Sequence, residues 1–129
     1  ASTFTDFTNL VAVKAPAAID KDGKLNKDLT VKADKTSATD GDEIKYTVTI
    51  PKGTKAESAD KTVTFTLAGV TAKSLDITGD ATVTKDTTHN TTAFKISTTA
   101  TTEETTVVFT VTVDAHVSAA IEAPTFAVA

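Results

Sequence analysis

The sequence predicts an all-β protein, an antiparallel β-sandwich of about eight or nine strands. Short stretches along most of the chain alternate apolar residues with polar ones, mostly threonine, which is the period of a strand with one buried face. Turns rich in glycine, proline and aspartate separate these stretches. No stretch carries an amphipathic helical pattern of useful length.

The clearest alternation lies in residues 29–50. Leu29, Val31 and Ala33 share one face of a predicted strand that runs to Lys35. Residues 39–43 hold Asp and Gly at the positions a tight turn favours. A second strand follows over residues 44–50, where a proline ends it. This stretch therefore predicts a hairpin.

The same pattern recurs towards the end of the chain. Its strongest case is residues 106–113, in which four apolar residues lie on one face of the predicted strand and mainly polar residues lie on the other. The other predicted strands are residues 62–67, 75–77, 81–83, 94–96 and 125–128. Because aromatic residues are only 5% of the chain, we expect a thin core of β-branched side chains.

The residues before this pattern predict two further segments. Residues 1–14 form an N-terminal strand, which either pairs within its own sheet or is donated to another copy. Residues 15–28 read as a polar linker, and residues 29–129 form the β-sandwich domain. The candidate assembly residues of the first segment are Phe4, Phe7, Leu10, Val11 and Val13.

Composition excludes several classes of function. The chain lacks Cys, Met, Trp, Arg and Gln, so it has no thiol nucleophile, disulfide or bidentate Arg contact. Its net charge of −4 argues against nucleic-acid binding, and no apolar run is long enough to insert in a membrane. An acidic, Thr-rich chain without Cys is typical of a secreted or surface-displayed prokaryotic protein; the alternative is a cytosolic domain of unusual composition.

A polar loop suggests one cofactor, calcium. The order Asp-x-Asp-Gly-x-Leu-Asn in residues 20–26 resembles part of an EF-hand-like loop, although no bidentate Glu closes it. The alternative is an ordinary solvated turn without a cofactor. The candidate ligands are Asp20, Asp22, Asn26 and Asp28.

Two blocks of sequence carry a resemblance to a known family. Residues 29–51, with the turn Thr-Asp-Gly-Asp-Glu before Tyr-Thr-Val-Thr-Ile-Pro, resemble the opening hairpin of immunoglobulin-like modules in bacterial surface proteins. The similar modules are the isopeptide-forming fimbrial (pilin backbone) domains and DUF11-like repeats. Residues 105–115 are similar to their penultimate strand. The resemblance implies an immunoglobulin-like sandwich in a pilus, fimbrium or stalk.

The same resemblance implies an amide cross-link between a buried Lys and an Asn or Asp, promoted by a buried acid. Lys35 and Lys32 are the candidate amines, and strand parity favours Lys35. The expected Asn is missing from the last predicted strand, and the remaining acceptor, Asp114, has outward parity. The alternative is a set of surface Lys and Asp side chains without a cross-link.

The sequence does not predict an enzyme. Ser118, His116 and Asp114 are too close along one strand to form a catalytic triad, and His89 is distant in sequence. Asn90 begins the sequon Asn-Thr-Thr and is a candidate glycosylation site.

We therefore expect a non-catalytic structural or adhesive subunit of a prokaryotic cell-surface assembly. Its partners would be further copies of itself or neighbouring surface domains, docked through residues 4–13 or 126–128. The alternative is an extracellular β-sandwich module that binds carbohydrate or protein, with or without calcium.

Overall fold

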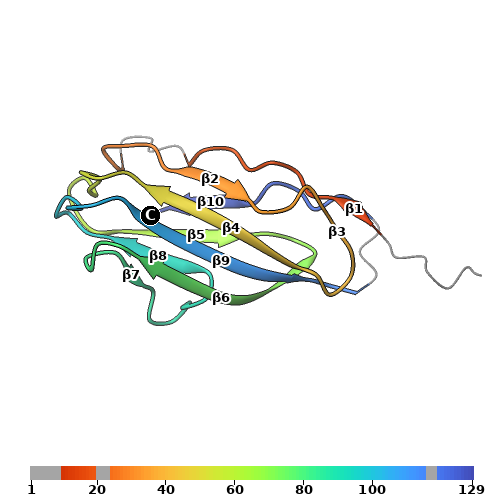
Figure 1. Cartoon of the computed structure of the whole chain (residues 1–129). Coiled ribbons are helices and arrows are strands. Elements are labelled where there is room, and N and C mark those ends of the chain that lie inside the picture. Colours follow the sequence, from red (N-terminus) through yellow and green to blue (C-terminus); the bar gives the residue numbers. More distant parts are fainter. Residues whose placement is uncertain (1–9, 20–23, 116–118) are drawn as a thin grey trace, which may run out of the picture.

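The computed structural model describes residues 10–19, 24–115 and 119–129, and these residues form ten strands and no helix (Figure 1). The strands are β1 (Val11–Ala12), β2 (Thr30–Ala33), β3 (Ser37–Ala38), β4 (Glu43–Ile50), β5 (Lys61–Thr66), β6 (Val70–Thr78), β7 (Thr84–Lys85), β8 (Ala93–Ile96), β9 (Thr105–Val113) and β10 (Thr125–Val128).

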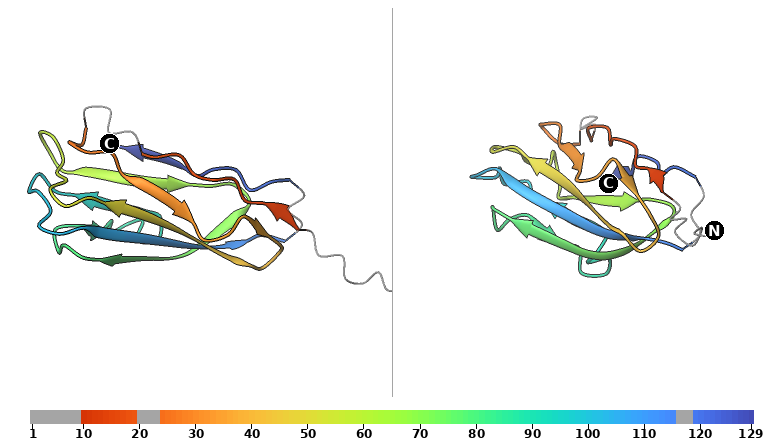
Figure 2. Two further views of the ribbon diagram at one scale, coloured as in Figure 1. Left: turned by 45° about the horizontal axis from the view of Figure 1, so that its top comes forward. Right: turned by 45° about the vertical axis from the view of Figure 1, so that its right-hand side comes forward.

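Two four-stranded antiparallel sheets make up the body of the molecule. One has the order β2-β4-β9-β6 and the other the order β10-β5-β8-β7, while β1 and β3 form a small third sheet. The two large sheets face each other as layers (Figure 2). The predicted all-β antiparallel sandwich is confirmed.

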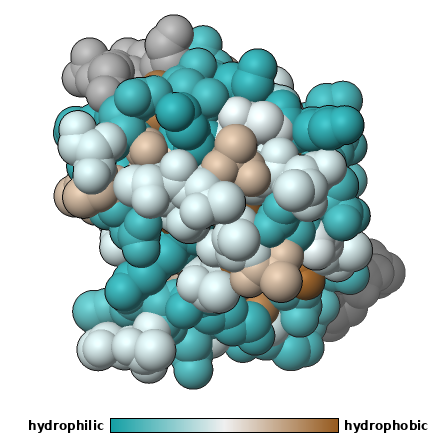
Figure 3. Space-filling model, turned by 90° about the vertical axis from the view of Figure 1, so that its left-hand side faces the viewer, coloured by the Kyte–Doolittle hydropathy of each residue, from teal (hydrophilic) through white to brown (hydrophobic). Residues whose placement is uncertain are grey.

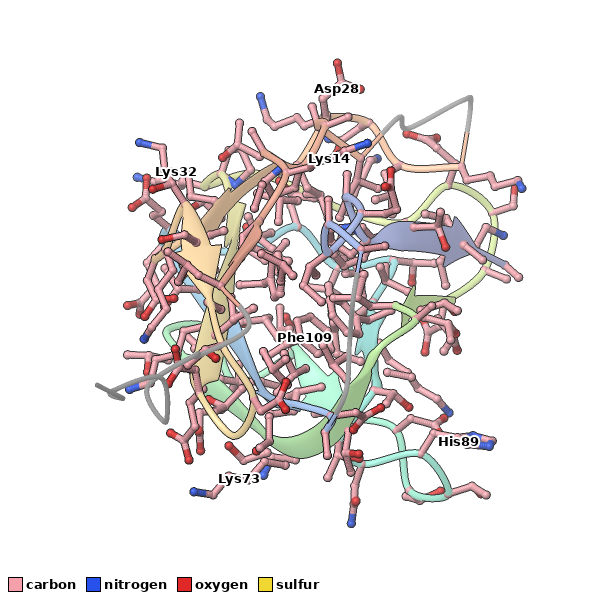
Figure 4. The ribbon with its side chains drawn as sticks, turned by 90° about the vertical axis from the view of Figure 1, so that its right-hand side faces the viewer. Lys14, Asp28, Lys32, Lys73, His89 and Phe109 are labelled. Carbon is pink, nitrogen blue, oxygen red and sulfur yellow. The ribbon has the colours of Figure 1, made fainter. Side chains whose placement is uncertain are left out.

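Aromatic side chains fill the space between the layers. Phe109 of β9 stacks on Phe65 of β5 with ring centroids 4.8 Å apart, and it lies between the two sheets in Figure 4. Tyr46, Phe94 and Phe126 contact one or both of these rings. Most of the buried apolar residues are valine and isoleucine, as expected, and strand pairing collects most of the few aromatic residues at one place within this β-branched core.

The predicted hairpin of residues 29–50 forms, but its first strand is shorter than expected. β2 pairs with β4 from Thr30 to Ala33, and Gly41 takes a φ of 82° in the turn. Between Ala33 and this turn the chain bends, and β3 leaves the sheet to pair with β1. The alternation alone does not reveal this change of partner, because both strands keep the same period of two.

One predicted strand is wrong. Residues 81–83 lie in a turn, whereas the stretch around Leu75 and Ile77 belongs to the nine-residue β6. Asp80 holds the turn by accepting hydrogen bonds from the backbone N–H and the hydroxyl of Thr82 at 2.8 and 2.6 Å. A local side-chain bond of this kind competes with strand formation.

The predicted polar linker contributes to the core. Ile19 and Leu25 are buried, and they form isolated bridges with Leu29 and Ala56. Single apolar residues in a polar stretch have no period, so the sequence pattern did not identify them as buried.

Residues 11–13 pack within their own chain. Val11 pairs with Ala38 of β3, and Val13 forms a parallel bridge with Ile121. Both valines are buried, whereas the Leu10 side chain before them is 64% exposed. Phe4 and Phe7 lie outside the described residues.

Candidate functional site: the open edge beside β2

Strand β2 lies at the edge of its sheet, beside the segment of residues 13–19. Hydrogen bonds join the two at both ends. The Val13 N–H donates to the Thr36 carbonyl at 2.9 Å, and the Ile19 N–H donates to the Leu29 carbonyl at 2.8 Å. Pro16 stands between these ends, where it has no N–H to offer a neighbouring strand. The two ends are therefore tied, and the middle of the β2 edge is left open.

Strand alternation shows which backbone groups point to this edge. The Asp34 N–H donates to the Lys45 carbonyl at 3.0 Å, so residue 34 turns its backbone towards β4. Leu29 turns its backbone the other way, towards Ile19. Since successive residues of a strand alternate, Val31 and Ala33 direct their N–H and C=O groups to the open edge. In the described part of the chain these groups have no backbone partner.

A groove of about 220 Å³ runs along the same edge. Its walls are mostly apolar, with Val13, Ala15 and Pro16 on one side and Val31 and Ala33 on the other. Lys32 and Lys35 add cationic groups to its lining. Unpaired backbone groups next to an apolar groove are the two features that an added strand requires.

The structure does not bring the candidate cross-link residues together. Lys32 is exposed and its side chain extends outwards (Figure 4), and Lys35 Nζ lies 3.9 Å from the Asp34 carboxylate. Asp114 accepts a hydrogen bond of 2.6 Å from the hydroxyl of Thr71 in β6. Asp114 directly follows β9, and β4 lies between β9 and β2, so the amines and this acceptor are on strands that are not neighbours.

Of the candidate calcium ligands, Asp20 and Asp22 lie outside the described residues, and Asp28 is exposed (Figure 4). The side chain of Asn26 holds the loop between β4 and β5 by two hydrogen bonds. Its Nδ2 donates to the Gly53 carbonyl at 2.9 Å, and its Oδ1 accepts from the Lys55 N–H at 2.8 Å. Within the described ranges, no three carboxylate or imidazole groups gather as metal ligands.

The candidate glycosylation residue, Asn90, is exposed in the connection between β7 and β8. Asp86 shapes this connection by accepting hydrogen bonds from the N–H groups of His89 and Thr88 at 2.8 and 3.1 Å. The bond from His89 is the main cause that lowers the pKa of the Asp86 carboxyl. His89 itself lies at the surface, away from the sheets (Figure 4), while His116 and Ser118 are outside the described residues.

Sequence reasoning missed a buried carboxylate at the end of the molecule where β4 ends and β9 begins. Asp80 accepts four hydrogen bonds, two from Thr82 and two from the N–H and hydroxyl of Thr102. These bonds, with the Thr82 hydroxyl the largest contributor, hold the Asp80 pKa well below its usual range. The order Asp-x-Thr after Gly79 is a turn signal that could have identified it.

Asp80 joins two loops through these hydrogen bonds. Its partners join the turn after β6 to the loop before β9, and Thr54 and Thr101 join the same region by donating to the Pro51 carbonyl. The surface at this end is largely hydrophilic, with small scattered apolar areas (Figure 3). We therefore take the β2 edge as the candidate functional site.

Fold and site together define a class: an antiparallel β-sandwich with an open strand edge. Comparison with protein-family models, with curated proteins and with solved structures found no match in any of the three. Among the described residues, no helix is long and apolar enough to cross a membrane.

Proposed function

We propose that this protein is a non-catalytic structural or adhesive subunit of a prokaryotic cell-surface assembly, such as a pilus, filament or stalk. The observation that carries the proposal is the open edge of β2. A row of unpaired backbone groups beside an apolar groove favours the addition of a strand from another protein molecule.

Two further observations support an assembly role. Val11 and Val13 anchor the start of the described chain in the subunit's own core, so a neighbour that binds the residues before Leu10 would be linked to a fixed point of this subunit. Strand ladders stiffen the body, and the loops at the β4–β9 end are fastened by Asp80 and Asn26. A stiff body in which the middle of the β2 edge is open suits a load-bearing subunit. The acidic, Thr-rich composition supports a position outside the cell.

The test is the state of association of the full chain. Light scattering coupled to size-exclusion chromatography, followed by electron microscopy, should show oligomers or filaments that increase with protein concentration. A variant that lacks residues 1–9 should stay monomeric and keep its strand content by circular dichroism. A full chain that is monomeric at every concentration would contradict the proposal.

The same preparation tests the alternative of a ligand-binding module. Calcium and a panel of oligosaccharides are added, and the melting temperature is measured. A rise on ligand addition, in a chain that does not associate, would favour the binding module.

A further inference from the structure

We propose that the groove beside β2 receives residues 4–10 of a second copy as an added strand, with Phe7 in the groove and Asp6 beside Lys32. This inference rests on the proposed function, because it names the partner and the register of that same edge.

The backbone supplies the first argument. Val31 and Ala33 offer two N–H donors and two C=O acceptors at the open edge, at alternate positions along β2. An extended segment that pairs there satisfies all four groups and continues the sheet β2-β4-β9-β6 by one strand. The residues 4–10 are long enough, since about four residues cover the unpaired stretch at about 3.3 Å each.

Side-chain parity supplies the second argument. In an extended segment, Phe7 lies on one face, whereas Asp6 and Thr8 lie on the other. In β2, Val31 is buried on the core face and Lys32 is exposed on the outer face. A strand that places Phe7 against the apolar wall therefore places Asp6 on the same outer face as Lys32. A groove of about 220 Å³ suits one large apolar side chain.

Charge supplies the third argument. Lys35 has Asp34 as its ion-pair partner, but Lys32 makes no ion pair with any described residue. Asp6 is the only acidic residue among residues 1–10. An exposed pair between Asp6 and Lys32 contributes little to affinity, but it favours one register of the added strand over its neighbours.

The direction of the chain indicates a second copy as the source. β1 is antiparallel to β3, so the chain traced back from Val13 to Leu10 runs alongside residues 36–38 and away from residues 31–35. To reach the groove of its own subunit, the segment before Leu10 would have to reverse its direction. Docking on another copy needs no reversal.

The absence of Cys allows a direct test in the full chain. F7C protein is mixed with A33C protein under mild oxidation, and the mixed disulfide dimer is quantified by mass spectrometry. A disulfide requires Cα atoms within about 7 Å, so only docked segments should link efficiently. The matched control is A81C, at an exposed position in the turn after β6. We expect at least a tenfold higher yield with A33C.

Two results would overturn the proposal. Equal yields with A33C and A81C would show that Phe7 has no preference for the groove. A disulfide within one chain of the double variant F7C/A33C, formed at high dilution, would show that the segment docks on its own subunit.

A charge exchange separates this inference from the proposed function. K32E should weaken association by about two- to fivefold, and D6K in the same chain should restore it. If deletion of residues 1–9 abolishes association while K32E and the cross-linking yields show no effect, the assembly role stands and the β2 groove is excluded. If the full chain does not associate and no mixed dimer forms, both are excluded.

Discussion

Tyr46 carries a buried polar group that lacks a hydrogen bond within the described core. It is fully buried on β4, and its hydroxyl has no hydrogen-bond partner among the described residues. Burial, reinforced by the negative charge of Asp34, raises the pKa of Tyr46 to about 12. The ring packs 5.5 Å from that of Phe65, so the residue contributes as an aromatic side chain rather than as a polar one.

Because Tyr46 is the only tyrosine, its ionisation can be followed by ultraviolet absorbance. The folded protein should ionise near pH 12, and the urea-unfolded chain near the ordinary value of 10.0. A folded-state pKa above the unfolded one gives stability that is complete below pH 10 and is lost as the pH rises through 12. A folded-state titration near 10 would contradict the burial of this hydroxyl.

The substitution Tyr46→Phe should leave stability unchanged or raise it by about 1 kcal/mol. It removes an unpaired buried hydroxyl and keeps the ring, and an unsatisfied buried polar group costs about 1–3 kcal/mol. Urea unfolding followed by circular dichroism measures the change. A loss of more than about 1 kcal/mol would mean that the hydroxyl has a partner in the folded protein.

Asp80, unlike Tyr46, has its buried polar group fully hydrogen-bonded, since both carboxylate oxygens accept hydrogen bonds. Asp80→Asn should lower the melting temperature at neutral pH, because an amide cannot accept all four hydrogen bonds. The matched control is Asp76→Asn on the exposed face of β6, which should leave the melting temperature nearly unchanged.

The pH dependence provides a second measurement on Asp80. Its folded-state pKa is lowered from 3.8, so its contribution is present above pH 3.8 and is lost as the pH falls through the lower folded value. The difference in melting temperature between the Asp80→Asn variant and the unsubstituted protein should therefore shrink in acid. A difference that is constant between pH 7 and pH 3 would rule out this role.

At the scale of elements, the connection between β6 and β7 depends on Gly79. Its φ is 130°, and a Cβ added there would lie 2.6 Å from the Thr105 hydroxyl oxygen and 2.9 Å from the Glu104 carbonyl oxygen. The connection and the start of β9 are thus packed backbone against backbone. This close approach also lets the Thr105 hydroxyl accept a hydrogen bond from the Asp80 N–H at 2.9 Å.

Two glycine substitutions separate this close packing from backbone conformation. Gly41→Ala, where φ is 82° and a Cβ would meet open space, should cost about 1–2 kcal/mol in the free energy of unfolding. Gly79→Ala should cost more, because a steric clash of about 1–3 kcal/mol adds to the conformational cost. Chemical denaturation of both variants measures the difference, and equal losses would contradict the close approach at Gly79.

At the scale of the whole molecule, the described core begins at Val11, since Val11 and Val13 are buried and Leu10 is exposed. Deletion of residues 1–9 should keep the free energy of unfolding, since Val11 and Val13 stay in place. Deletion of residues 1–14 should lower it by about 3–6 kcal/mol, because two buried valines contribute about 1.5–3 kcal/mol each. Urea titration of both variants measures this. Equal stability would mean that residues 11–14 are not part of the core.

The sequence by itself determined the fold class and most of the strands. Alternation with a period of two places Val48 and Val107 in the core, because this pattern belongs to the strand itself and does not depend on its neighbours. The turn at Gly41 was predictable for the same reason, since its conformation is local. The immunoglobulin-like relationship and the surface assembly stay predictions.

Only the tertiary structure decided which strands meet. It moved β3 to a third sheet, collected the aromatic rings around Phe109 and placed Ile19 and Leu25 in the core. It also placed β4 between β2 and β9, the strand that Asp114 follows, and left the middle of the β2 edge without a backbone partner. These features depend on pairings between residues far apart in the chain, and a period of two is the same whichever partner a strand takes.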